Sequence, residues 1–314
     1  MALSGSYDFV RNRDQIITGA YRLCGVLGAG ESPTAEEVTD GSEILNLLIK
    51  EWQHKDVGLW LQEEGVLFMD KTSASFSLGP SGDEACLLGD LIKTEIATAA
   101  IATAATLVVD STTGMAAADR IGIVLDDGTL DWTTIVTVDS STGLTITTGL
   151  TSAAAVDRNV YTYTNKIQRP LGILEMRLHY DDGRDTPQNL ISRTEYMDLT
   201  NKTTTGPPVQ VYYHATLTNG TLYVWPITTD VTQQLYFTSK RSIQDVDAAT
   251  DDLEFPPQWG NALRYGLAAE LGIEHGTPAS VMKLINEQAT LKRLEAREGD
   301  DDGVAFTLAP ESWG

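Results

Sequence analysis

One stretch, residues 34–60, constrains the fold more than any other part of the chain, because it carries both a helix start and a helix stop. Thr34 and Glu37 have capping-box spacing, in which each side chain satisfies the backbone N–H of the other. Gly58 is placed to end the helix in a left-handed conformation. Apolar residues recur between them at steps of three and four; they are Val38, Ile44, Leu45, Leu48 and Trp52, with Leu47 and Ile49 widening the arc. A helix this apolar is expected to pack against other helices on more than one side, and Gly41 inside it indicates either close helix contact or a tolerated exposed glycine.

Three further segments are predicted to be helical, and they lie at the two ends of the chain. Residues 11–28 begin with Asn12 at a capping position, carry an apolar stripe and end at a glycine. Near the C-terminus Pro256-Pro257 opens a second segment, and Thr277 is placed to cap a third. The apolar stripe of that last helix consists of Val281, Leu284, Ile285, Gln288, Leu291 and Leu294. We expect the C-terminal helices to pack on the N-terminal pair.

Between these helical ends the apolar pattern changes to a period of two, which is typical of β-strands. The pair Asn219-Gly220 marks a hairpin turn, and Ser192 with Glu195 marks a short capped helix among the strands. The strands predicted here are 66–69, 75–78, 172–180, 188–191, 209–213, 222–225 and 234–237. We expect the last two to be neighbours in one antiparallel sheet.

Residues 81–163 differ in composition from both flanks, being rich in Thr, Ala, Ser, Gly and Asp and poor in Lys and Arg. Turn signals separate short strand candidates at 106–109, 120–125, 132–138, 144–147 and 160–163. Such short, regularly spaced strands are typical of a small β-sandwich or barrel. Asp126, Asp127 and Asp131 are conceivable calcium ligands, but an Asp-Gly hairpin turn explains the first two more simply.

The predicted fold is therefore α+β, with a helical bundle built from the N- and C-terminal helices, an antiparallel β part, and an inserted all-β domain that is a sandwich or a small barrel. Residues 1–80 and 164–298 form the predicted core, residues 81–163 the inserted domain, and residues 299–314 a flexible C-terminal tail.

The tail supplies the candidate partner-binding residues. Phe306, Leu308 and Trp313 follow an acidic linker, and no other part of the chain combines apolar anchors with such a link. Segments of this kind are usually disordered alone, and their apolar residues can dock into a partner.

Charge and composition exclude several functional classes. The net charge is −22, and the few Lys and Arg residues form no cluster of the kind that gives tight binding to free duplex DNA. The two cysteines, Cys24 and Cys86, are too few for a disulfide framework or a four-cysteine zinc site. No apolar run is long enough to span a bilayer and no secretory leader is recognised, so we expect a soluble chain that does not meet the membrane.

No catalytic constellation is predicted. The four histidines stand in four different elements without metal-ligand spacing, and no nucleophile elbow or phosphate loop is present. Carboxylate pairs such as Glu63-Glu64 and Asp251-Asp252 could serve glycoside hydrolysis, but so many acids produce pairs by chance. We therefore expect no enzyme activity, no catalytic residue, no cofactor and no metal.

Several short segments together resemble one protein family, the head-to-tail adaptor proteins of short-tailed bacteriophages. That group includes the tail tubular A proteins and the factors that stabilise packaged DNA. The matching segments are Gly28–Glu31, Ala35–Trp52, Gly206–Pro208, Leu222–Pro226 and Asp251–Leu271. The resemblance extends over residues 1–78 and 167–297; the β insertion is a departure from the smallest family members.

The resemblance implies a structural protein of the virion neck, assembled in the host cytoplasm. Family members form a homo-oligomeric ring, here expected to hold about twelve copies, between the portal protein and the tail nozzle, a tail tubular B-like protein. The ring continues the DNA channel, helps retain the packaged genome and lets DNA pass without sequence-specific binding. The C-terminal tail would meet the portal, and the inserted domain could face a tail fibre or the capsid.

Two other classes of function stay open at the level of the sequence. The Thr-rich insertion and the scattered aromatic residues suit a carbohydrate-binding or adhesin-type tail module. The carboxylate pairs suit a tail-associated glycan hydrolase. Neither alternative explains the capped helices at the two ends, which an adaptor uses for packing between copies.

Overall fold

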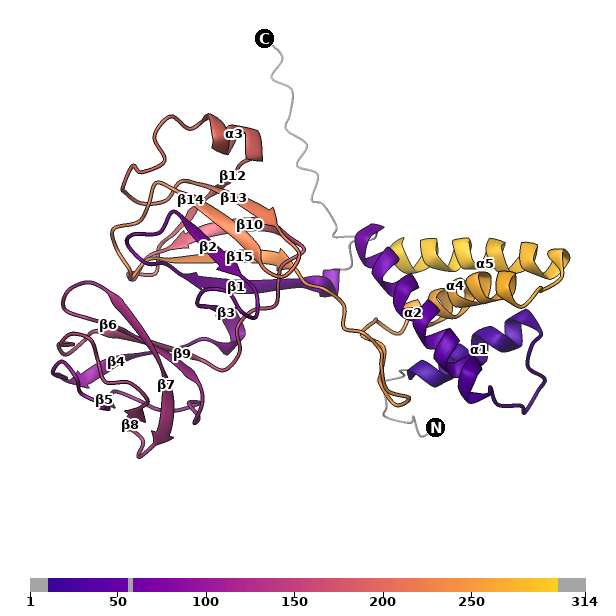
Figure 1. Ribbon diagram of the computed structural model, residues 1–314, viewed down its shortest axis with the longest axis horizontal. Helices are drawn as coiled ribbons and strands as arrows, with labels where there is room; N and C mark the ends of the chain where they lie inside the picture. The colour runs from indigo at the N-terminus through magenta and orange to yellow at the C-terminus, as the bar shows by residue number, and fades with distance from the viewer. Residues whose placement is uncertain (1–10, 56–58, 299–314) are drawn as a thin grey trace, which may run out of the picture. The chain divides into compact units, whose positions relative to one another are not determined.

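The structure is a computed structural model that describes residues 11–55 and 59–298 of the chain. It is a mixed α+β protein, as predicted (Figure 1). The chain divides into two compact units. A helical unit comprises residues 1–61 and 243–314, and a β unit comprises residues 62–242. The division differs from the predicted one, because the strands on both sides of the insertion group with the inserted strands and not with the helices.

The described residues of the helical unit form four long helices around one hydrophobic core. They are α1 (Arg13–Cys24), α2 (Ala35–Lys55), α4 (Trp259–Glu274) and α5 (Ala279–Glu298), with a 3-10 turn at Leu59–Leu61. Trp259 of α4, Tyr21 of α1 and Ile49 of α2 are fully buried members of this core. The helices from the two ends of the chain therefore contribute to the same core.

The helix starts follow the predicted local signals. The Glu37 carboxylate accepts a hydrogen bond of 2.7 Å from the Thr34 N–H, and the Thr34 hydroxyl accepts one of 3.3 Å from the Glu37 N–H, so the capping box of α2 is present. The Asn12 side chain accepts a hydrogen bond of 3.0 Å from the Gln15 N–H and caps α1. These bonds span three residues, which is why sequence spacing alone could predict them.

Two predicted helix boundaries are wrong, and a third lies outside the described residues. Helix α1 ends at Gly25, which has φ of 77°, and not at Gly28. The Thr277 hydroxyl donates to the carbonyl oxygen of Cys24, at 3.2 Å, so it ties α5 to α1 and is not seen capping α5. Gly58, the predicted end of α2, is not among the residues described.

Helix α2 packs closely on α1 but does not bury its whole apolar arc. A Cβ atom at Gly41 would lie 2.8 Å from the Ile17 side chain, so this glycine allows the close contact that was one of the two interpretations. Trp52 of α2 also packs against Gly266 of α4, so the expected packing on more than one side is present, although Leu47 remains 64% exposed.

The β unit contains two open sheets that share a core. The five-stranded sheet has the order β11-β10-β15-β1-β3 and the four-stranded sheet the order β12-β13-β14-β2. The first comprises β1 (Gln62–Phe68), β3 (Ala85–Leu87), β10 (Gly172–His179), β11 (Asp185–Pro187) and β15 (Gln234–Lys240). The second comprises β2 (Ser75–Leu78), β12 (Asn189–Leu190), β13 (Gln210–Ala215) and β14 (Gly220–Trp225), with helix α3 (Arg193–Asp198) between β12 and β13. Pairing is antiparallel except between β12 and β13.

The predicted pairing of β14 with β15 is wrong. Strand β15 lies between β10 and β1 in the other sheet, whereas β14 pairs with β13 and β2. Leu235 and Phe237 of β15 and Leu222 of β14 all face the core shared by the two sheets. The alternation of apolar and polar residues determines which face of a strand is buried, but it does not determine which strand lies beside it. The pattern of β15 is therefore compatible with a place in either sheet.

The inserted strands form a closed barrel of order β4-β5-β8-β7-β6-β9, which decides between the predicted sandwich and barrel. Its strands are β4 (Ile92–Thr98), β5 (Thr106–Val109), β6 (Arg120–Val124), β7 (Leu130–Val138), β8 (Gly143–Ile146) and β9 (Asn159–Tyr163), and a 3-10 turn at Leu88–Asp90 precedes them. The prediction missed β4, because its end runs into the Ala/Thr-rich residues 97–105 without a turn signal. Strand β3, inside the predicted insertion, pairs instead with β1.

A half-buried carboxylate fixes the barrel to the neighbouring sheet. Glu84, just before β3, forms hydrogen bonds with Arg120 of β6 and Tyr163 of β9, and Lys166 lies 3.3 Å away. Burial alone would raise the pKa of this carboxyl, but the donors on Arg120 and Tyr163 outweigh it and hold the pKa below its usual value. An aromatic cluster of Phe68, Trp132, Tyr161 and Tyr163 packs beside it.

Candidate interaction surface

The described residues offer no assembled metal site. Residues 11–55 and 59–298 contain no group of three or more His, Cys, Asp or Glu side chains suited to hold an ion. His179 pairs with Asp185 at 2.7 Å and stacks on Tyr236, whereas His214 lies on another strand and His275 at the end of α4. The side chain of the fourth histidine, His54, falls outside the described part.

The three aspartates considered as calcium ligands each hold a different piece of loop. Asp126 accepts a hydrogen bond from the N–H of Ala155, Asp127 from that of Thr129, and Asp131 from that of Thr151. These oxygens already satisfy backbone donors, so their arrangement follows from loop structure and not from a common ligand.

In the carboxylate pairs, Glu63, Glu64 and Asp251 have partners of their own. Glu63 forms an ion pair with Arg241 at 2.7 Å, and Glu64 lies 3.6 Å from Arg177. The Asp251 carboxylate accepts a hydrogen bond from the Ala248 N–H and organises the turn before α4. Neighbouring acids in the sequence are therefore used separately for ion pairing and turn formation.

Both cysteine thiols are free and buried. Burial raises the pKa of Cys24 and of Cys86, which keeps the thiols protonated and unreactive at neutral pH. Cys24 belongs to the core of the helical unit and Cys86 to a core of the β unit.

The aromatic residues of β13 and β14 pack on one another. Tyr212 stacks on Tyr223 with ring centroids 5.6 Å apart, and Tyr196 of α3 lies 5.0 Å from Tyr223. Tyr196 and Tyr212 are buried. Their ring faces therefore stabilise the contact of α3 with the sheet and leave little open surface for a sugar ring.

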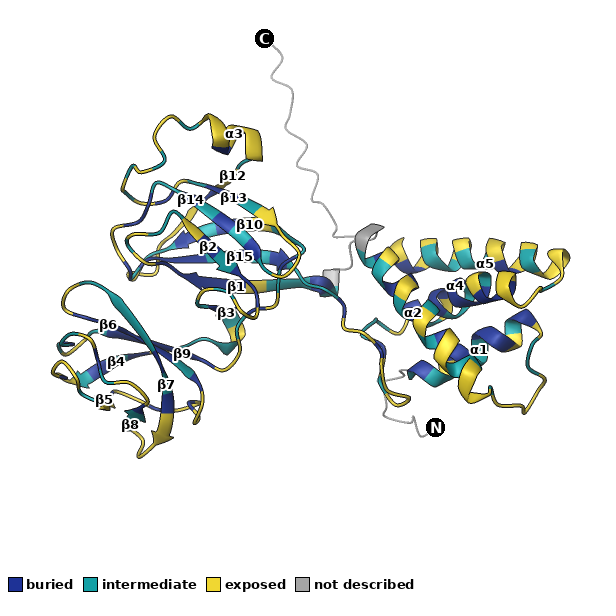
Figure 2. Ribbon diagram, viewed as in Figure 1, coloured by how far each residue is buried: buried dark blue, intermediate teal, exposed yellow. Residues whose placement is uncertain are grey.

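The sequence-predicted contact residues Phe306, Leu308 and Trp313 lie outside the described residues. The last described element before these residues in the sequence is α5, and several of its apolar side chains have no partner among the described residues. Leu284 is 63% exposed, and Leu291 and Leu294 are exposed as well. Figure 2 shows exposed segments recurring along α5. The predicted apolar stripe of α5 is therefore not the face that packs on the other helices. Of the described residues of α5, Ile285 and Ala296 are buried, and Ile285 alone belongs to the predicted stripe.

A groove of about 540 Å³ lies between α2, α4 and α5. Its apolar lining consists of Leu48, Trp52, Gly266, Ala269, Ala289 and Leu294, and its charged lining of Glu51, Glu270, Arg293 and Arg297. The Arg293 guanidinium lies 4.9 Å over the Trp52 ring, a distance that favours cation–π attraction. A Cβ atom on Gly266 would come within 2.8 Å of Trp52, so this glycine lets the indole reach the floor of the groove.

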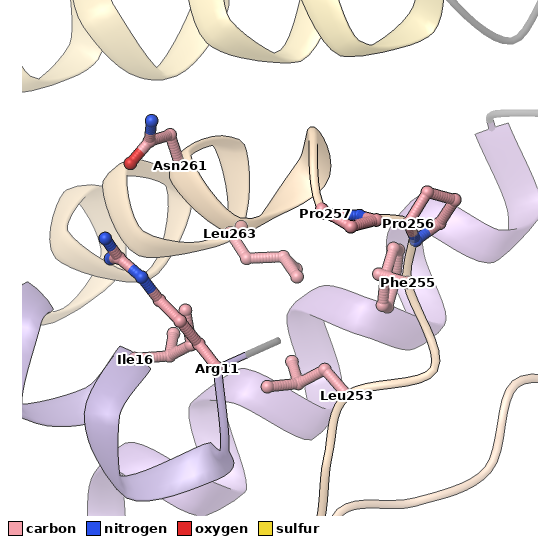
Figure 3. A pocket seen from close by; sticks show the side chains of 9 residues that line it. Arg11, Ile16, Leu253, Phe255, Pro256, Pro257, Asn261 and Leu263 are labelled. Carbon is pink, nitrogen blue, oxygen red and sulfur yellow. The ribbon is translucent and has the colours of Figure 1, made fainter. Parts of the chain in front are cut away.

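A smaller pocket of about 60 Å³ marks the entry of the chain into α4 (Figure 3). Leu253, Phe255 and Leu263 line it together with Ile16 of α1, and Arg11 and Asn261 stand at its edge. The volume suits one or two water molecules and is far below that of a ligand site. The segment before α4, which includes Leu253, Phe255 and Pro256-Pro257, therefore packs within the helical unit.

The groove and the exposed leucines of α5 are candidate interaction features that sequence reasoning missed. The apolar period of α5 correctly indicated a helix, but it did not indicate that Leu284, Leu291 and Leu294 would find no partner. The available signal was the length of the apolar stripe, which exceeds what one neighbouring helix can cover.

Comparisons with known proteins add no family to these observations. A scan of the chain against models of protein families finds no match, and a search among curated proteins finds none. Among the described helices, none has the length and apolar character needed to cross a bilayer.

Proposed function

We propose that this chain is a head-to-tail adaptor of a short-tailed bacteriophage. In this proposal about twelve copies form a ring between the portal protein and the tail nozzle, continue the DNA channel and help retain the packaged genome. The N- and C-terminal helices act as a helical bundle that packs against neighbouring copies. The protein would reside in the neck of the virion and have no enzyme activity.

The unpartnered face of the helical unit carries this proposal. Leu284, Leu291 and Leu294 of α5 are exposed, and Leu294 also lines the partly apolar groove between α2, α4 and α5. Large apolar side chains gathered on one unpartnered element are typical of a surface that a partner covers. An adaptor subunit has neighbours that would cover it. The adhesin and glycan-hydrolase alternatives need an open aromatic platform or paired free carboxylates, and the observed tyrosines and acids favour neither.

The distribution of roles along the chain follows from the same proposal. The acidic surface repels phosphates within about 8 Å at physiological salt, so that DNA slides through and does not adhere. Phe306, Leu308 and Trp313 would contact the portal, and the barrel would face a fibre or the capsid. Nanomolar, sequence-dependent binding to duplex DNA would contradict the role given to the charge.

The decisive experiment is recovery of the chain from its natural assembly. An affinity tag is added to the gene in the phage that carries it, particles and free complexes are purified from lysate, and they are imaged by electron microscopy and analysed by mass spectrometry. A ring stacked on a portal is the expected result. Purified complexes without a portal would contradict the proposal, and a glycan-bound particle would favour the adhesin alternative.

A further inference from the structure

A stripe of acidic residues runs along the exposed side of α2. Glu36, Asp40, Glu43 and Leu47 follow one another at steps of four, three and four residues, so they share one helix face about 16 Å long. All four are exposed. Glu37 follows Glu36 directly and so lies on another side of the helix, and its carboxylate takes part in the capping box. We call these four residues the α2 stripe.

The carboxylates of the α2 stripe are not neutralised within the helical unit. No Lys or Arg of the described residues lies within 4.0 Å of Glu36, Asp40 or Glu43, and no hydrogen bond to their carboxylates is formed there. Other acids of the chain differ, as Asp245 does by pairing with Lys50 at 2.7 Å. The stripe therefore presents three uncompensated negative charges followed by one exposed leucine.

A hollow of opposite charge lies on α1 and α4 of the same unit. It has a volume of about 520 Å³, and its lining residues are Arg11, Asn12, Asp14, Gln15, Thr18, Gly19, Arg22 and Arg264. Its one acid, Asp14, is paired with Arg13 at 3.0 Å. We call this the α1–α4 hollow.

Two arginines of the hollow are held in place by neutral partners. Arg22 donates to the carbonyl oxygen of Glu31 at 3.0 Å, and Arg264 donates to the carbonyl oxygen of Gly19 at 3.2 Å. No described carboxylate lies within 4.0 Å of either guanidinium. A Cβ atom on Gly19 would come 2.9 Å from the Arg264 side chain, so the glycine makes room for that arginine across α1.

Charge complementarity identifies what this hollow can receive. The chain has 44 acidic and 22 basic residues, so carboxylates are the most abundant partners for these arginines. Carboxylates carried on one helix face suit guanidinium donors, and the Arg22 and Arg264 guanidiniums are already held by carbonyl oxygens before any contact. Free nucleic acid is a poorer occupant, since the net charge of −22 repels it at a distance and no continuous basic track follows the hollow.

We infer that the α1–α4 hollow of one copy receives the α2 stripe of a second copy. The two surfaces consist of different residues, so the contact is head-to-tail: each copy offers one stripe and one hollow. Repetition of such a contact closes into a ring when the rotation between copies allows it. The inference rests on the proposed ring assembly and names the residues that join its subunits.

Two charge reversals test this contact on the full-length protein. The stripe variant carries Asp40→Lys and Glu43→Lys, and the hollow variant carries Arg22→Glu and Arg264→Glu. Because Arg264 packs on Gly19, a third variant with Arg22→Glu alone guards against misfolding of the second. Sedimentation velocity up to about 0.2 mM protein in 0.15 M salt, where the Debye length is ~8 Å, measures assembly, and circular dichroism checks the helices.

We expect the wild-type chain to associate and each variant to be weakened on the order of 100-fold. An equimolar mixture of stripe and hollow variants should assemble again. In that mixture the reversed stripe meets the reversed hollow, and the two unchanged surfaces meet each other. A control with Asp110→Lys and Asp198→Lys, two exposed acids of the β unit, changes the net charge as much as the stripe variant and should assemble like the wild type.

Three results would overturn the inference. They are a wild-type chain that stays monomeric over the whole range, an assembly indifferent to the reversals, and an assembly that the mixture does not restore. If the hollow variant loses assembly and the stripe variant does not, the arginines bind another anion and the inference is also wrong. If rings bind the portal and the charge reversals do not change assembly, the adaptor function stands and this contact is refuted. If the mixed variants assemble again but no copy associates with a portal, the contact stands and the adaptor function is refuted.

Discussion

The barrel and helix α2 use acidic residues in opposite ways. In the barrel, the Asp119 carboxylate is buried and accepts a hydrogen bond of 2.7 Å from the Ala116 N–H, and Asp139 accepts from the hydroxyls of Thr137 and Thr145. On α2, Glu43 and its neighbours in the stripe lie in solvent without such donors. Asp119 and Asp139 thus stabilise the loops of the barrel itself, whereas the stripe acids and the exposed leucines of the helical unit lie at the surface of their unit.

The largest effect is expected at Glu84, the half-buried carboxylate that fixes the barrel. Replacing Glu84 by Ala leaves Arg120 and Lys166 facing each other without a counter-charge, and this should lower the free energy of unfolding by about 3 kcal/mol. Urea unfolding followed by tryptophan fluorescence measures the change. Glu43→Ala serves as the exposed control, and a loss at Glu84 no larger than at Glu43 would show that burial does not separate the two classes of acid.

A smaller loss is expected inside the barrel. Asp119→Ala removes the acceptor of the Ala116 N–H at a position that is only 2% exposed, which should cost about 2 kcal/mol. Asp119→Asn keeps an acceptor oxygen and should recover part of the stability. Equal stability of all three proteins in thermal unfolding would mean that the loop does not depend on this carboxylate.

The pH dependence of the β unit follows from the lowered pKa of Glu84. A carboxyl with a lower pKa in the folded than in the unfolded protein contributes stability above its unfolded pKa of about 4.3, and this contribution is lost as the pH falls through the folded pKa. We expect stability to be constant near neutrality and to decline in that acidic window. Glu84→Gln should be less stable at neutral pH and decline less on acidification, and parallel curves for both proteins would contradict the assignment.

The smallest effect on stability is expected on the exposed faces of the helical unit. Leu291→Ser on α5 and Glu43→Gln on α2 should each change the free energy of unfolding by no more than about 0.5 kcal/mol. Each should nevertheless weaken association with partners, which sedimentation and copurification measure. Ile285→Ala, at a buried position of the same helix, is the matched control and should lose more than 2 kcal/mol.

Local signals determined the elements of this chain. The capping boxes at Thr34–Glu37 and Ser192–Glu195 form as their spacing predicts, because both partners lie within one turn of helix. Five of the barrel strands were likewise indicated by turn residues and alternation, with β4 (Ile92–Thr98) as the exception. The sequence by itself therefore established the α+β class, the helical ends and the inserted β region.

Only the tertiary structure decided how these elements meet. Which sheet holds β15, the closure of the inserted strands into a barrel, and the contact of Glu84 with Arg120 depend on segments far apart in the chain. The same holds for the candidate surfaces: Leu291 stays exposed, and Arg22 and Arg264 line one hollow, because of helix packing and not because of their neighbours in sequence. Periodicity reports that a side chain belongs to a face, and only the fold determines whether anything covers that face.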